Sequence, residues 1–261
     1  MTNYGQAYRI SPKLVLRVWQ REVTLYRRIW PSTILSTLFD PVLYLLAMGF
    51  GLGAYVAQID GVPYIQFIGP GLVASSIMSA SAYEAAWNSY VRIFVERSYE
   101  GMMTTPAELE DVVAGEVAWA ATRALISSTV MLGVLAGFGL VRSWWALLVP
   151  PVAVLGAIMF TILGLSYTVR TKHMDQLTFM FTLGITPMYL FSGIFFPLSG
   201  MPAWVQTAAW ISPLYHLVEV VRTLVLGHPS PMTLVHVAVI AGIGLAFWGL
   251  PTRILRRRLR S

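Results

Sequence analysis

The sequence predicts an all-α integral membrane protein with six transmembrane helices, and three observations carry this prediction. The 261 residues are 56% hydrophobic and only 11% charged, whereas a soluble domain is about 25% charged. Six apolar segments reach roughly 20 residues, the length that a helix needs to cross a bilayer. The net charge of +6 is concentrated near the termini and in two loops, which is typical of cytoplasmic flanks and not of a nucleic-acid-binding surface.

An N-terminal amphipathic helix is expected over residues 11–30. Ser11 is a suitable N-cap, and Pro12 suits the first helical position. Basic residues recur at every fourth position along this segment: Lys13, Arg17 and Arg21. Apolar residues occupy another face: Leu14, Val18 and Leu25. A helix of this kind lies at the cytoplasmic membrane interface, although a helix with a merely solvated basic face is the alternative.

The six predicted spans alternate with more polar segments along the chain. They are Ser32–Val56, Phe67–Tyr90, Val117–Leu140, Trp144–Val169, Leu177–Phe196 and Thr233–Leu250. With a cytoplasmic N-terminus, most of the 18 basic residues fall on the cytoplasmic side, as the positive-inside rule requires. We therefore expect a multi-pass protein of the cytoplasmic (inner) membrane with both termini in the cytoplasm.

The segment 197–232, between spans five and six, is expected to form a short re-entrant helix pair on the outer side. The first helix is expected near Trp204–Ile211 and lies at the interface. The second begins at Ser212-Pro213 and ends at Leu226-Gly227, so its body is 14 residues long. At about 1.5 Å per residue it covers roughly 21 Å, too short to span the hydrocarbon core.

The segment Arg92–Glu116 is expected to be a cytoplasmic loop that binds a soluble protein. It holds six of the 12 acidic residues, and acidic charge does not favour the anionic lipid of the cytoplasmic leaflet. Thr105-Pro106-Ala107-Glu108 fits a capping box that starts a short helix. The expected apolar face of that helix is Leu109, Val112 and Val113. Gly101 permits a sharp turn and Met102-Met103 are expected to be exposed, while a structured loop without a partner is the alternative.

Five charged residues are expected at or near membrane depth: Asp40, Glu84, Arg123, Glu219 and Arg222. Charges there are costly and face a cavity or an opposite charge. Glu219 and Arg222 are three residues apart on one helix and can pair directly, and Arg123 is a candidate partner for Glu84. The sequence leaves open whether these pairs are structural or contact a substrate.

An intramembrane enzyme is the alternative class, based on His216 and Glu219, which share a helix face and invite a metal or proton-relay site. The chain lacks an H-E-x-x-H motif, a third evident ligand, a Gly-rich P-loop and a G-x-S-x-G motif. It also has no cysteine, which excludes a thiolate nucleophile. A transport protein without catalytic residues is therefore the favoured class.

Two stretches carry a resemblance to a known family. The sequence TPMYLFSGIFFPL at Thr186–Leu198, followed by Pro202, Trp204, Pro213, His216 and Arg222, resembles the signature of type-2 ABC exporter permeases. The segment Glu96–Pro106 looks like the coupling segment of that family. More narrowly, Gly115–Arg123 and Leu226–Pro229 resemble the NodJ-like permeases of nodulation-factor exporters. The resemblance covers nearly the whole chain, which implies a single type-2 ABC transmembrane domain over residues 1–261.

The resemblance implies a permease homodimer that binds two copies of an ABC ATPase through the loop 92–116. ATP and Mg belong to that ATPase, so this chain is expected to have neither enzymatic activity nor a cofactor of its own. The implied coupling residues are Glu96, Arg97, Glu100, Gly101, Met102, Met103, Thr105 and Pro106.

The implied cargo is an amphiphilic, lipid-linked or lipo-oligosaccharide or polysaccharide-type molecule that leaves through the bilayer. In the NodJ-like permeases it is a lipochitooligosaccharide, and the alternative is a drug or another hydrophobic small molecule. The expected cargo pathway comprises Tyr83, Glu84, Trp87, Tyr189 and Phe191. The expected outer gate comprises Pro197, His216, Glu219 and Arg222.

Overall fold

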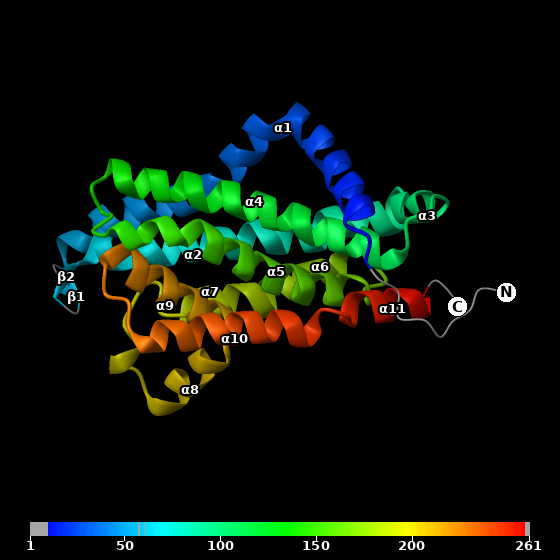
Figure 1. Cartoon of the computed structure of the whole chain (residues 1–261). Helices are drawn as coiled ribbons and strands as arrows, with labels where there is room; N and C mark the ends of the chain where they lie inside the picture. The colour runs from blue at the N-terminus through cyan, green and yellow to red at the C-terminus, as the bar shows by residue number, and fades with distance from the viewer. Residues whose placement is uncertain (1–9, 57, 60, 259–261) are drawn as a thin grey trace.

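The computed structural model describes residues 10–56, 58–59 and 61–258, and it is mostly helical, as predicted (Figure 1). The helices are α1 Pro12–Leu46, α2 Tyr64–Tyr83, α3 Ser98–Met103, α4 Leu109–Gly137, α5 Val149–Thr168, α6 Asp175–Phe179, α7 Thr186–Phe191, α8 Ala203–Ile211, α9 Pro213–Leu226, α10 Pro231–Phe247 and α11 Leu250–Arg258. The strands β1 Gln58–Ile59 and β2 Val62–Pro63 form a small antiparallel hairpin. Figure 1 places this hairpin at one end of the bundle and α3 and α11 at the other.

Within the part of the chain that the structure describes, four helical stretches are long and apolar enough to cross a membrane: Tyr64–Val95, Leu109–Gly137, Trp144–Thr168 and Pro231–Arg258. They correspond to the second, third, fourth and sixth predicted spans. The pair α8–α9, bent by 90°, adds a fifth if it counts as one broken span, and a re-entrant loop has the same geometry. The first predicted span contains only a shorter apolar stretch, Phe39–Ala54, and the fifth is divided into α6, a π-helical turn and α7.

Helix α1 corrects the prediction of a separate amphipathic helix followed by a span. It begins at Pro12 as expected, but it continues without interruption for 35 residues and contains Pro31 and Pro41. Figure 1 shows α1 arching away from α4 at its middle, as a proline inside a helix causes. On the predicted apolar face Val18 is buried against the bundle, whereas Leu25 is 46% exposed.

The start of α4 corrects the prediction of a short helix capped by Thr105. The capping box lies one turn later, where the Glu108 backbone N–H donates to Asp111 Oδ2 at 3.1 Å. The helix that begins there is the 29-residue α4 itself. Its predicted apolar face is confirmed, since Leu109, Val112 and Val113 are buried. The sharp turn is made by Arg97, whose φ is 51°, and Gly101 lies inside α3 instead.

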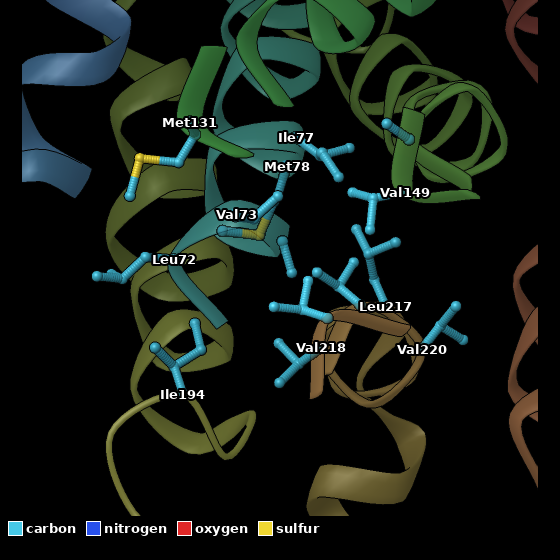
Figure 2. Packing of buried hydrophobic residues seen from close by; sticks show 14 of the residues in the cluster. Leu72, Val73, Ile77, Met78, Met131, Val149, Ile194, Leu217, Val218 and Val220 are labelled. Carbon is cyan, nitrogen blue, oxygen red and sulfur yellow. The ribbon is translucent and has the colours of Figure 1, made fainter. Parts of the chain in front are cut away.

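The main core surrounds α2, whose membrane-length stretch is largely buried. It combines side chains of α2 with those of α4, α5 and α9, among them Leu72, Ile77, Met78, Met131, Val149, Leu217 and Val218 (Figure 2). Close packing of this kind fixes α2, α4, α5 and α9 relative to one another.

A second apolar cluster joins the elements at the α3 end of the bundle. It contains Val18 of α1, Tyr99 of α3, Val113 of α4, Leu165 of α5 and Leu255 of α11. Helix α1 approaches α4 so closely that a Cβ on Gly115 would lie 2.6 Å from Val18 Cβ. The glycine is therefore required for this helix contact.

We predict that Gly115→Ala destabilises the protein by about 1–3 kcal/mol, because an added methyl group overpacks the α1–α4 contact. Gly133 of α4 is the matched control, since a Cβ there meets nothing within 4 Å. Gly133→Ala should be neutral or stabilising, because alanine favours helix over glycine. The measurement is the thermal unfolding midpoint of each purified variant in detergent. Equal midpoints for the two variants would contradict the close contact.

Candidate functional site: a buried charge cluster beside a cavity

A cavity of about 570 Å³ lies between α1, α4 and the extended end of α2. Its wall includes Tyr26 from α1, Tyr83 and Glu84 from the α2 stretch, and Trp119 and Arg123 from α4. Two predicted pathway residues, Tyr83 and Glu84, are thus on the wall. The other three, Trp87, Tyr189 and Phe191, are not among the described residues that line this cavity.

The three remaining pathway residues lie in aromatic contacts or at the surface. Trp87 stacks on Phe181 at 6.4 Å between ring centroids, and Phe181 also contacts Tyr83 at 4.8 Å. Tyr189 packs edge-on against Phe195 at 5.2 Å, and Phe191 is 49% exposed. The predicted set is therefore not a single surface in this structure.

The helix that supplies Glu84 continues beyond α2 through two π-helical turns, Glu84–Asn88 and Val91–Val95. In the first turn, Ser89 Oγ lies 3.0 Å from the Glu84 carbonyl oxygen. Turns of this kind insert an extra residue and often occur at functional sites. Here they carry Arg92 and Glu84 to the same side of the helix.

Arg92 is shared by three carboxylates from three helices. Its Nη2 lies 2.7 Å from Glu22 Oε2 and 2.7 Å from Glu84 Oε1. Its Nη1 lies 2.9 Å from Glu116 Oε2. Each glutamate side chain is only 1% exposed. We call Glu22, Glu84, Arg92 and Glu116 the Arg92 cluster.

Two further arginines complete the charge balance. Arg123 pairs with Glu84 Oε2, and Arg21 Nη1 lies 2.7 Å from Glu22 Oε1. Neutral donors add to this: the Asn88 amide donates to Glu84 at 2.8 Å and the Ser89 hydroxyl to Glu116 at 2.7 Å. Three carboxyl groups thus face three guanidinium groups, and such pairing is the condition for tolerating charges that are out of water.

The pairing of Glu84 with Arg123 confirms the sequence prediction, but the cluster as a whole was missed. Arg92 and Glu116 were assigned to an exposed cytoplasmic loop, and Glu22 was not considered. The sequence contains one indication that Glu22 is buried. Glu22 is the only acidic residue before Asp40, and it lies four residues after the buried Val18, on the same helix face. A carboxylate on the apolar face of a basic helix indicates a buried partner.

Burial raises the pKa of Glu22 to about 7, against an ordinary value of 4.5, while the neighbouring Arg92 lowers it. The negative charge of Glu116 raises the pKa further, and Arg21 and Glu84 oppose each other in smaller effects. Glu22, the one carboxyl group that α1 contributes to the Arg92 cluster, therefore titrates near neutral pH.

The coupling residues are mostly at the surface, as expected for a docking segment. The exposed ones are Glu96, Arg97, Glu100, Gly101, Thr105 and Pro106. Met102 and Met103, expected to be exposed, are instead half-buried against the apolar cluster at the α3 end. The acidic surface is also smaller than predicted, since Asp111 and Glu116 are buried and Glu110 pairs with Arg256.

The predicted outer-gate residues lie around α9. Glu219 Oε1 pairs with Arg222 Nη1 at 2.7 Å, as predicted. Arg222 also donates to the Gly193 carbonyl and lies 4.2 Å from the centre of the Phe67 ring. Pro197 is partly buried in the segment that connects α7 to α8.

His216 faces a partner other than the predicted Glu219. Its Nδ1 lies 2.7 Å from Nδ1 of His236 on α10, and its Nε2 lies 2.8 Å from the Trp210 carbonyl. Because a carbonyl only accepts, Nε2 carries the hydrogen, and His216 Nδ1 accepts from His236. Among the described residues, no group of three His, Cys, Asp or Glu side chains could hold a metal ion.

The comparisons with known proteins agree on one family. The family model described as ABC-2 type transporter matches residues 13–226. Nodulation protein J of Rhizobium meliloti (strain 1021) is 35% identical over 94% of this chain and 93% of its own length. Nodulation protein J of Sinorhizobium fredii is 33% identical over 99% of this chain and 98% of its own length. The inner membrane transport permease YadH of Escherichia coli (strain K12) is 27% identical over 80% of this chain and 82% of its own length.

We predict that wild-type stability falls as the pH rises from about 4.5 to about 7, because Glu22 binds a proton in the folded state through this window and the unfolded state does not. Glu22→Gln removes this titration, so its stability curve should be flatter. The measurement is the unfolding free energy of both proteins in detergent across this range. Parallel curves would contradict the raised pKa of Glu22.

Proposed function

Because the chain belongs to the ABC-2 type transporter family, we propose that it is the membrane permease of an ATP-driven exporter for an amphiphilic, lipid-linked or lipo-oligosaccharide-type cargo. As a permease it is a transport subunit and not an enzyme. The proposal adds that two copies pair, that each binds one ABC ATPase, and that cargo leaves across the cytoplasmic membrane. The names of its relatives, a nodulation protein and an inner membrane transport permease, support this assignment.

The observation that carries the cargo proposal is the composition of the cavity wall. Tyr26 and Tyr83 offer aromatic faces on which sugar rings can stack, and Asn88 and Arg123 offer hydrogen-bond donors. A purely apolar cargo gains nothing from such donors and would have to displace the water around them. A cargo with both a saccharide and a lipid part satisfies both kinds of group.

The proposed topology keeps six spans with both termini in the cytoplasm. The second half of α1 with Phe39–Ala54 would be the first span, and α6 through α7 the fifth, while α8 and α9 stay on the outer side. The basic helix α11 supports this arrangement, because Arg256 pairs with Glu110 at the same end of the bundle as α3. Both the basic C-terminal helix and the docking loop then lie in the cytoplasm, as the positive-inside rule requires.

The proposed ATPase contact is centred on α3. Glu100 in α3 and Glu96 just before it are exposed and can set the register of a basic groove on the ATPase. Met102 and Met103 extend from the buried cluster to the surface. A flexible thioether side chain suits a contact that must persist while the partner moves.

The cargo test uses the permease reconstituted in proteoliposomes with its cognate ABC ATPase. We expect ATP-dependent movement of a labelled lipochitooligosaccharide, and we expect Tyr83→Ala to weaken it about fivefold through loss of roughly 1 kcal/mol of stacking. Tyr55→Ala is the matched control, because Tyr55 is 89% exposed and not among the residues that line the cavity. Movement of a hydrophobic dye without movement of the saccharide would favour a drug exporter and contradict the proposed cargo.

The coupling test reverses one charge on the docking loop. Glu100→Arg is expected to leave basal ATP hydrolysis intact and to abolish most transport, because it places like charges across the interface. Met102→Asp should act in the same direction by disturbing the contact. Asp175→Arg, a reversal at another exposed acid, is the control. Normal cargo-stimulated hydrolysis and transport in both loop variants would exclude this loop as the transmitting contact.

A further inference from the structure

The three helices that line the cavity each supply one carboxylate to the same arginine. On α1, Glu22 lies on the wall together with Tyr26, one turn later, and Arg92 lies on the wall as well. In the α2 stretch, Glu84 is itself on the wall. On α4, Glu116 lies one turn before Trp119. At this point the distances between the three helices are therefore fixed by the ion pairs that each of their glutamates makes with Arg92.

The Arg92 cluster also adjoins α3. The π-helical turn Val91–Val95 carries Arg92 and is followed by the turn at Arg97, after which α3 begins at Ser98. Arg21, which pairs with Glu22, donates through Nη2 to the Ser98 hydroxyl at 3.1 Å. The cluster thus lies between α3 and the cavity. Glu22, Glu84 and Arg92 line the cavity, and Arg21 connects Glu22 to Ser98 of α3.

We infer that Arg92 is the positioning residue of a gate at the α3 end of the cavity, which opens when Glu22 separates from Arg92 and α1 moves away from α4. The transport role of this gate rests on the proposed function. The contacts that form it can be tested in the permease alone.

Helix α1 is the wall with the fewest other attachments. Among residues 12–30 only Val18 and Glu22 are buried, and Ile29 is 56% exposed. Its other contacts with α4 include the bond from Trp19 Nε1 to Thr122 at 2.9 Å, the Ser11 N–H bond to Asp111 Oδ1 at 2.7 Å, and Arg123 at 5.9 Å from the centre of the Tyr26 ring. By contrast, α2 and α4 share the main core. Loss of the Glu22–Arg92 pair should therefore displace α1 and leave α2 and α4 in place.

The chemistry of the cluster requires arginine and not only a positive charge. Two guanidinium nitrogens of Arg92 serve three carboxylates from separate helices. A lysine has one nitrogen on a flexible stem and cannot reproduce this planar fork. Arg92→Lys keeps the charge and should still release α1, a result that a purely electrostatic role does not predict.

The experiment measures the distance between α1 and α4 by pulsed dipolar spectroscopy on spin labels. The chain has no cysteine, so labels can be placed at Thr24→Cys on α1 and Thr129→Cys on α4, both exposed. We expect Glu22→Gln and Arg92→Lys to shift this distance to larger values and to broaden its distribution. Glu22→Gln keeps Arg92 paired with Glu84 and Glu116, so a folded variant is available even if Arg92→Lys is unstable.

Two controls separate a gate from a general loss of structure. Arg28→Gln removes a charge from an exposed position on α1 and should leave the Thr24–Thr129 distance unchanged. A second label pair, Thr129→Cys with Leu245→Cys on α10, should keep the wild-type distance in every variant. Unchanged α1–α4 distances in both Glu22→Gln and Arg92→Lys, or an equal change in the α4–α10 pair, would overturn the inference.

Transport is then measured separately, as lipochitooligosaccharide moved per ATP hydrolysed in proteoliposomes with the ATPase. Glu22→Gln is expected to lower this ratio, and Arg28→Gln to leave it unchanged. A wild-type ratio in Glu22→Gln would overturn the role of the gate in transport. If the wild-type complex moves no cargo, the proposed function fails, while the distance measurement still decides whether Arg92 holds α1.

Discussion

The interaction on which this architecture depends is the sharing of one buried guanidinium by three buried carboxylates. Charges removed from water are tolerated only when each is paired, and removing one partner of such a set costs about 3–5 kcal/mol. This requirement fixes the position of α1 more strictly than its apolar contacts do, because Val18 alone could pack at several registers. With Glu22 bonded to Arg92 at 2.7 Å, only one register of α1 against α4 remains.

The π-helical turns follow from the same requirement. At 100° per residue, an ideal α-helix would place positions 84 and 92 about 80° apart around its axis. One extra residue in the turn Glu84–Asn88 reduces this separation to about 20°. Both side chains can then reach the same point beside α4. The irregular backbone is thus explained by the pairing of Glu84 with Arg92, and it also widens the helix at the wall of the cavity.

Local patterns in the sequence were sufficient for much of the fold and for little of the site. Apolar segments located four membrane-length helices, and the Ser-Pro start and glycine end located α9 to the residue. Glu219 and Arg222 could be paired because they are three residues apart. The other members of the Arg92 cluster, Glu84, Arg92 and Glu116, lie 62 to 94 residues beyond Glu22, and contacts at such separations leave no periodic pattern. The sequence predicts a helix over residues 11–30 and a separate span from Ser32, whereas α1 is continuous over Pro12–Leu46 with Pro31 and Pro41 inside it.

The location of the charge cluster also bears on how a short helix can transmit movement. Six residues are too few for a helix to be stable by itself, so α3 depends on the burial of Tyr99 among Val18, Leu255 and their neighbours. Displacing α3 must therefore disturb α1 and α11 as well.

At the cavity, apolar contacts alone would resist opening, because separating them exposes apolar surface to water. Separating Glu22 from Arg92 instead returns the Glu22 carboxylate to water while Arg92 stays paired with Glu84 and Glu116, so hydration offsets much of the lost pairing energy. A buried ion pair next to an apolar cluster thus allows α1 to have two positions of similar free energy, which is the property that a gate requires.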